Sequence, residues 1–410
     1  MFINELPDEC LLTIFDYLNN FDDLANCYKV CIKWSHLIAE RTRKVKYLMV
    51  SEFSKDPDYS SDLVYYQGLD LSTRYKTLLS TLFSNLPILH NPNIYNSDFI
   101  YIVIELLKKV IDFEKKEKEL ENETEDLEKL EQFFFLKRHL KSLKGIINCC
   151  DVNINIEILC DKLEMLSSFR IEPGSLKNGS SIKQLHTEYD DEDFERVAHH
   201  FPNLERLHIN LVDGLWESPV LEQLKILELK LRAWHDFSLA FLFLDLCPNL
   251  QSAHITVNIN HFSVNERLKN ESLQDLVIDY YDGPNRVDWN DLKRALTKYP
   301  NLKHLSLRSL FCIKDEHIKQ FVPILPNLVL FDIYDCPAVT QRAADYVQDY
   351  CKRYGRSIKF YFKGNRDELV SDWPQLSTRK EKISQGFDFM KHCFLKDFDD
   401  LPCFLIPKDY

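Results

Sequence analysis

Glycine is scarce in this chain, at nine of 410 residues. The sequence therefore has few places for a loop whose glycine backbone cradles a phosphate, and it contains no Walker loop. The serine elbow Gly-x-Ser-x-Gly, the zinc-protease pair His-Glu-x-x-His and the protein-kinase motifs are also absent. From these absences we predict that the chain is not an enzyme and has no catalytic residues and no cofactor.

Cysteine pairs at metal-binding spacing are absent as well. The chain has twelve cysteines but no Cys-x-x-Cys, and no histidine cluster accompanies the nearest pairs, Cys27/Cys31 and Cys149/Cys150. We therefore predict no metal site, and we expect reduced thiols in a reducing compartment.

Two further absences limit the partners and the location. The net charge is −13, so the excess of basic residues that binds phosphate backbones is missing. The N-terminus lacks the features of a signal peptide, and the most apolar stretch, 239–246, is too short to span a bilayer and contains Asp245. We expect a cytoplasmic or nuclear protein, or one present in both places, with neither nucleic acid nor a membrane as its partner.

Helical signals dominate the first 43 residues. Leu11, Ile14, Phe15 and Leu18 have the spacing of one helix face, and Pro7 precedes them, where its missing N–H needs no helical partner. Two more short helices are predicted to follow. Because three helices of this length cannot bury a self-sufficient core, the unit must dock on another surface.

The same residues resemble an F-box. The resemblance rests on the opening Leu-Pro, the Ile-Phe-x-x-Leu of the first helix, the Asp-Leu of the second and the Val-Cys-x-x-Trp of the third. It implies docking on the Skp-type adaptor of a cullin–RING ubiquitin ligase; the alternative is a helical cap that packs on the rest of the chain. The residues implied in adaptor binding are Leu6, Pro7, Leu11, Ile14, Phe15, Leu18, Leu24 and Trp34.

A second pattern, L-x-x-L-x-L, recurs with variation through the second half at intervals of 20 to 29 residues. A Pro-Asn-Leu leads four of the copies. Weaker copies stand at Leu166-Phe169-Ile171 and Ile182-Leu185-Thr187, and Val45-Leu48-Val50 and Ile358-Phe360-Phe362 are candidates for the first and last. The clear copies begin at Leu204, Leu224, Leu250, Leu273, Leu302 and Leu328.

This pattern resembles leucine-rich repeats, in which each repeat is a short strand with a helix behind it and neighbours stack into a curved solenoid. The alternative is a generic α/β domain with leucine-rich strands. We predict an α/β fold with an N-terminal three-helix F-box followed by a curved leucine-rich-repeat solenoid. The predicted domains are an F-box at 1–44, a linker with irregular early repeats and a charged helical insertion at 45–150, the solenoid at 151–365, and a C-terminal cap or tail at 366–410.

Strand side chains alternate, so the residues between the inward Leu and Ile positions face the concave side of such a solenoid. Their charges are mixed in sign, which suits recognition of a protein rather than of a phosphate backbone. The alternative for each is a solvated sheet face. The predicted substrate-binding residues are Arg206, His208, Glu228, Lys230, His254, Asp275, Asp279, His304, Arg308, Asp332 and Tyr334.

Two segments fit neither resemblance. The charged stretch 114–132 keeps Leu120 and Leu127 seven residues apart, but Thr124 occupies a companion position that a coiled coil needs to be apolar. We interpret the stretch as a solvated helix or mobile insertion. The tail after 365 is rich in aromatics, which argues against disorder; we expect it to cap the last repeat, and the alternative is that it folds back along the concave face.

Taken together, the resemblances imply a substrate-recognition subunit of a Skp–cullin–F-box ubiquitin ligase. The F-box would bind the adaptor, and through it the cullin–RING ligase, and the repeats would bind a protein substrate that the sequence does not identify. The alternative is a scaffold or inhibitor that uses the solenoid alone.

Overall fold

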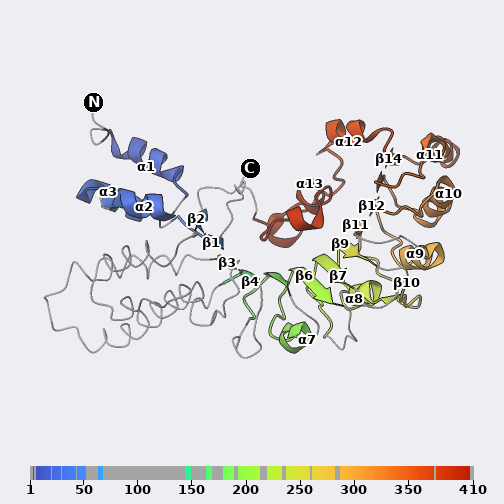
Figure 1. Cartoon of the computed structure of the whole chain (residues 1–410), viewed down its shortest axis with the longest axis horizontal. Helices are drawn as coiled ribbons and strands as arrows, with labels where there is room; N and C mark the ends of the chain where they lie inside the picture. Colours follow the sequence, from blue (N-terminus) through green and yellow to red (C-terminus); the bar gives the residue numbers. More distant parts are fainter. Residues whose placement is uncertain are drawn as a thin grey trace. The chain divides into compact units, whose positions relative to one another are not determined.

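Figure 1 presents a computed structural model of the whole chain. It divides into two compact units, residues 1–182 and 183–410. The residues that the structure describes are 3, 6–19, 21–28, 30–42, 44–51, 63–67, 144–148, 163–168, 179–188, 193–212, 219–232, 237–258, 261–281, 287–373 and 375–406.

Three helices open the first unit, as predicted: α1 (Asp8–Asp16), α2 (Phe21–Tyr28) and α3 (Ile32–Thr42). Pro7 is the N-cap residue of α1, and Asp8 and Glu9 in the first turn suit the positive end of the helix dipole. The helices share one small apolar core, in which the rings of Phe15 and Trp34 meet edge to face at 5.1 Å.

Parallel strands follow in this unit, in the order β2 (Leu63–Gln67), β1 (Tyr47–Ser51), β3 (Gly145–Asn148) and β4 (Met165–Ser168). β1 coincides with the predicted first copy of the repeat. The copy predicted at Leu166-Phe169-Ile171 is wrong by three residues: Leu163 and Leu166 are buried, and Ser168 ends the strand. The polar Ser168 at the third position hid this register in the sequence.

The second unit contains a longer parallel sheet, in which the strands lie side by side in the order in which they occur along the chain. A side-by-side pair of two-residue strands, β8 (Phe237–Ser238) and β10 (His261–Phe262), lies apart from it. The strands of the sheet are β5 (Gln184–Glu188), β6 (Arg206–Val212), β7 (Ile226–Arg232), β9 (Ser252–Val257), β11 (Asp275–Tyr280), β12 (His304–Arg308), β13 (Leu330–Tyr334) and β14 (Lys359–Tyr361).

The register of this sheet confirms the clear copies of the leucine pattern. The second and third positions of neighbouring copies are paired across the strands and are buried, so they form two continuous apolar ladders. One ladder contains Leu207, Leu227, Ala253, Leu276, Leu305 and Phe331, and the other contains Ile209, Leu229, Ile255, Ile278, Leu307 and Ile333.

Helices cover one side of this sheet, which Figure 1 shows as the outer side of its curve. Thr340 and Asp288 accept hydrogen bonds from backbone N–H groups as N-caps, and Gly355 ends the longest of these helices in the left-handed conformation. The helices are α7 (Asp193–Ala198), α8 (Ala240–Asp245), α9 (Trp289–Leu296), α10 (Asp315–Ile324) and α11 (Gln341–Tyr354).

The tail has two parts. Helix α12 (Arg366–Asp372) packs beside β14, where Tyr361 donates a hydrogen bond to Asp372 at 2.6 Å. Residues 375–406, here called the tail segment, contain α13 (Phe389–His392) and return across the side of the strands opposite the helices. The expected cap therefore describes α12 alone, and the tail segment follows the alternative of folding back along the sheet.

The stretch 114–132 lies outside the described residues. No helix in the described part of the chain has the length and apolar character needed to cross a bilayer.

Candidate protein-binding surfaces

The predicted substrate-binding residues all belong to strands β6 to β13 and occupy the positions that alternate with the apolar ladders. We call this side of the sheet the polar face. The eleven residues are not solvated as a group, because the tail segment lies over most of them and Arg366 of α12 contacts Asp332 and Tyr334. Those with buried side chains are Arg206, His208, Glu228, His254, Asp275, His304, Arg308 and Asp332.

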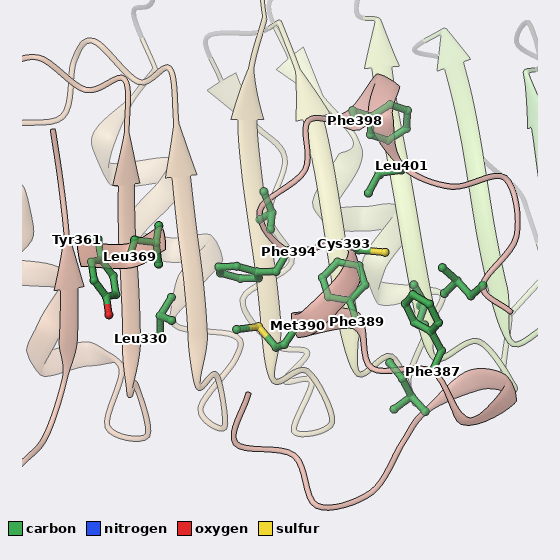
Figure 2. Close-up of a cluster of buried hydrophobic side chains, with 14 residues drawn as sticks. Leu330, Tyr361, Leu369, Phe387, Phe389, Met390, Cys393, Phe394, Phe398 and Leu401 are labelled. Atoms are coloured by element: carbon green, nitrogen blue, oxygen red, sulfur yellow. The ribbon is translucent and has the colours of Figure 1, made fainter. Parts of the chain in front are cut away.

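Figure 2 shows how the tail segment crosses the strands. Phe387, Phe389, Met390 and Phe394 point into a cluster that includes Ile226, Val277 and Leu330 of the polar face. The apolar residues of the tail thus find burial on the few apolar positions of a face that is otherwise charged.

One charge network lies beneath the tail on β6 and β7. Arg206 forms a buried ion pair with Glu228, and Glu228 also accepts from His208 at 2.9 Å. Burial alone would raise the pKa of Glu228, but Arg206 and His208 lower it below its ordinary value. His186 stacks on His208 at 4.2 Å, and its pKa is well below the usual range because burial and these neighbouring groups disfavour its cation.

A second network joins β11, β12 and the tail segment. Asp275 contacts His304 Nδ1 at 2.7 Å and accepts from Arg379 Nη2 at 2.7 Å, and Thr378 Oγ1 lies 3.1 Å from His304 Nε2. Burial would raise the pKa of Asp275, yet hydrogen bonding to His304 and the charge of Arg379 lower it overall. A carboxylate of the face is thereby neutralised by an arginine of the tail.

The remaining predicted residues lie toward the ends of the strands. Lys230 pairs with Asp399 of the tail at 2.7 Å, and Tyr334 is 39% exposed with the Arg366 guanidinium stacked 3.6 Å from its ring centre. Burial raises the pKa of Asp279 above its ordinary value; the Arg308 charge partly offsets this rise, and the Asp397 carboxylate adds to it. These end positions are the more accessible part of the predicted set.

Gln184 and Arg379 are among the residues of this interface that were not predicted. Gln184 belongs to a weak copy of the repeat, and its side chain makes two hydrogen bonds with the backbone of Leu405. Arg379 lies in the tail, where no repeat pattern draws attention to it. Gln184 could have been predicted from its position, because it starts the strand that follows Ile182. No feature of the sequence pointed to Arg379.

Three possible metal ligands also lie together, His261, Asp288 and Asp291, with ligand atoms within 4.8 Å of one another. Asp288 accepts from the Asn290 N–H as the N-cap of α9. The Asp291 carboxylate contacts His261, Arg294 and the Phe262 N–H. Protein groups already serve as partners for both carboxylates. We therefore interpret these three residues as a network that caps α9.

In the first unit, a buried arginine joins the N-terminal helices. Arg41 of α3 donates from Nε to the Phe15 carbonyl at 3.2 Å and from Nη2 to the Leu18 carbonyl at 3.4 Å, and it also pairs with Asp16. These carbonyls lie at and just beyond the C-terminal end of α1, where the helix dipole favours a cation.

Comparison with family models gives one match in this region. Residues 3–43 match the F-box-like family. The match covers α1 to α3 and leaves the rest of the chain unassigned.

Comparison with curated proteins gives no match. Among solved structures, a complex of TLR13 with ssRNA13 aligns at 15% identity and a TM-score of 0.36, covering 54% of this chain and 39% of that chain. A complex of Rad7 and Elc1 in yeast aligns at 13% identity and a TM-score of 0.25, covering 58% of this chain and 78% of that chain. At these scores neither likeness carries a functional argument.

Within the F-box-like domain, the eight predicted adaptor-binding residues separate into two groups. Pro7 and Ile14 are exposed, and Leu6 and Leu18 are partly buried. The other four form the core that holds the helices together, because so small a unit places its largest apolar side chains inside. They are Leu11, Phe15, Leu24 and Trp34.

Further apolar side chains of this domain are exposed that the sequence did not single out. Tyr17 is 83% exposed and Ile32 is 78% exposed, and Ile3 and Val30 are also accessible. Tyr17 follows Ile14 by three residues, so both lie on the same outward side of α1. Exposed apolar groups at this density are typical of an interface.

Proposed function

We propose that this chain is a substrate-recognition subunit of a Skp–cullin–F-box ubiquitin ligase. Its F-box-like domain would dock on the Skp-type adaptor, and its second unit would hold a protein substrate. The observation that carries the proposal is the F-box-like match at residues 3–43.

The exposed side of the F-box-like domain supports adaptor docking. Pro7, Ile14 and Tyr17 present apolar surface along α1, while the core of the domain is filled by other residues. An apolar surface that is not needed for the internal core is suited to a partner protein. We assign the contact to Leu6, Pro7, Ile14, Leu18 and Tyr17.

The proposed mechanism involves no bond chemistry by this chain. Simultaneous binding of the adaptor and of a substrate converts ubiquitin transfer to that substrate into a reaction at high effective concentration. The chain would act as a non-catalytic recruiting subunit, and its specificity would come from the second unit.

The first prediction tests adaptor binding. Purified Skp-type adaptor should co-purify with the wild-type chain, and Leu6→Ala with Pro7→Ala should weaken capture at least tenfold, because Pro7 is exposed and Leu6 is partly exposed at the edge of the core. Ile14→Glu should have the same effect, since it places a charge on the 41%-exposed apolar side of α1.

Val370→Glu is the matched control, because Val370 is a 72%-exposed apolar residue on α12 in the other unit. It should leave adaptor capture unchanged. Failure of the wild-type chain to bind the adaptor would favour the alternative, a scaffold in which the N-terminal helices are only a cap.

A further inference from the structure

The two sides of the second sheet have opposite chemistry. The side under the helices carries the apolar ladders, as a permanently buried face does. The polar face carries arginine, histidine and carboxylate side chains, although most of them are also buried. A sequence built to accept a permanent layer there would place apolar residues on both sides, so the polar face is suited to an exchangeable occupant.

Side chains of the polar face form hydrogen bonds with the main chain of the tail segment. Arg206 donates to the carbonyls of Pro402 at 2.6 Å and Cys403 at 2.7 Å. Arg308 donates to the carbonyl of Lys396 at 2.6 Å and to that of Phe394. These bonds depend on carbonyl positions and not on tail side chains, so another segment with the same backbone course would supply the same acceptors.

Gln184 forms similar hydrogen bonds near the C-terminal end of the tail segment. Its Nε2 donates to the Leu405 carbonyl at 2.9 Å, and its Oε1 accepts from the Leu405 N–H at 2.8 Å. A primary amide that pairs with both backbone groups of one residue imitates a neighbouring strand. Hydrogen bonds to the backbone groups of a ligand are one way in which proteins bind peptides.

The tail leaves polar atoms of the face without partners. His254 and Thr256 are buried on β9, and among the described residues neither ring nitrogen of His254 nor the Thr256 hydroxyl has a hydrogen-bond partner. The ring of Phe398 meets His254 edge to face at 5.7 Å. Buried polar groups without partners are costly, so the tail is an imperfect complement to the centre of the face.

The side chains of the tail indicate what else would fit. Asp399 pairs with Lys230 at 2.7 Å, and Asp397 lies 3.6 Å from Arg308. Phe394, Phe398 and Leu401 are buried between and beside these acids. The occupant therefore combines acidic residues with large apolar residues every three or four positions.

We propose that the tail segment is an intramolecular occupant of a peptide-binding site on the polar face. In its place the site takes a protein segment that follows the same backbone course and in which acidic residues alternate with large apolar ones. The inference rests on the proposed function, since it describes the class of substrate that such a subunit would recruit. The tail segment lowers the apparent affinity for such a ligand, because the ligand binds only the fraction of molecules in which the polar face is open.

The test uses the full chain and a fluorescent peptide with the sequence of residues 392–406, both cysteines being replaced by serine. Binding is measured by anisotropy. The variant Phe394→Ala with Phe398→Ala weakens the tail without altering the face, and it should bind the peptide at least tenfold more tightly than the wild-type chain. A peptide in which Asp397 and Asp399 are replaced by lysine should bind at least tenfold more weakly than the parent peptide.

Lys391→Ala with Lys396→Ala is the matched control, because both lysines are exposed on the same segment. It should bind the peptide no better than the wild-type chain. Equal, absent or charge-independent binding of the peptide by the weakened variant would overturn the proposal.

Hydrogen exchange of the wild-type chain decides the question if the weakened variant does not fold. Amides of residues 389–405 should open at least tenfold more often than those of β9 and β11, while the strands stay protected. Equal protection of tail and strands would show a permanent core layer and exclude an exchangeable one. Adaptor capture is measured on the same samples, so failure of the proposed function is seen separately from failure of this inference.

Discussion

At the scale of single residues, side chains matter here mainly by satisfying backbone groups that the fold leaves open. Arg41 donates to carbonyls at the end of α1, and Asn249, Asn301 and Asn327 each donate to a carbonyl in the turn of the preceding repeat, at 2.8 to 2.9 Å. These asparagines are the middle residues of the Pro-Asn-Leu triplets. Their recurrence in the sequence thus has a physical cause, which is the joining of adjacent turns.

The second prediction concerns Arg41. Arg41→Met should destabilise the helices of the F-box-like domain by about 2–4 kcal/mol, because it removes the hydrogen bonds that the buried guanidinium donates to the Phe15 and Leu18 carbonyls and its ion pair with the partly exposed Asp16. Hydrogen exchange of residues 8–18 measures the effect.

Lys44→Met is the control for Arg41. Lys44 pairs with the same Asp16 carboxylate at 3.1 Å, but at the surface, so its loss should cost less than about 1 kcal/mol. Similar exchange in the two variants would contradict the structural role given to Arg41.

At the scale of elements, the end of the second sheet is closed by a side chain. The Phe362 N–H donates to Asn365 Oδ1 at 2.8 Å, and Asn365 Nδ2 donates to the Phe360 carbonyl at 3.0 Å. Lys359 N–H bonds back to Val329, so Phe360 and Phe362 present their backbone groups to the open side of β14. Asn365 therefore takes the place that another repeat would occupy.

The third prediction follows from that closure. Asn365→Ala should speed hydrogen exchange of the Phe362 amide about tenfold, equivalent to the roughly 1.4 kcal/mol of one or two lost hydrogen bonds. The exposed edge should also promote self-association that increases with concentration, measured by light scattering.

Asn327→Ala is the control for the edge, because its side chain bonds to the Pro300 carbonyl between repeats and not to β14. If this variant self-associates to the same extent, Asn365 does not protect the edge of β14.

At the scale of the whole molecule, burial of the polar face makes stability depend on pH. His254 is fully buried, and its pKa is well below the usual range, first because of burial and then because of the charges of Arg308 and His208. His186 is shifted in the same direction. An unfolded chain takes up these protons below a pKa of about 6.5, while the folded chain does not.

The fourth prediction gives this dependence a sign. Above about pH 6.5, these histidines should not lower the free energy of unfolding of the second unit. Below that pH, the free energy of unfolding should decline by up to about 1.4 kcal/mol per pH unit for each shifted histidine. Urea unfolding at pH 7.5 and pH 5.5 measures the slope, and His254→Asn should reduce it.

His199→Asn serves as the control for the pH slope, because His199 is exposed at the end of α7. A slope that is the same in the wild-type chain and the His254 variant would show that His254 is not a buried neutral group.

The sequence by itself determined the local structure and the two resemblances. The spacing around Leu11 and Phe15 predicts the first helix, and the alternation in copies such as Leu204-Leu207-Ile209 predicts which strand side chains are buried, because helices and strands repeat at fixed periods. The F-box-like match was visible for the same reason, since it depends on residues at fixed offsets within 3–43.

The tertiary structure alone decided which surfaces stay open. The sequence could not reveal that Leu11 and Phe15 belong to the domain core while Pro7 and Ile14 are exposed, because helix spacing does not say what covers each face. Nor could it reveal that Arg379 neutralises Asp275, about a hundred residues away along the chain. Contacts between distant segments depend on how the tail packs, and no local period encodes that choice.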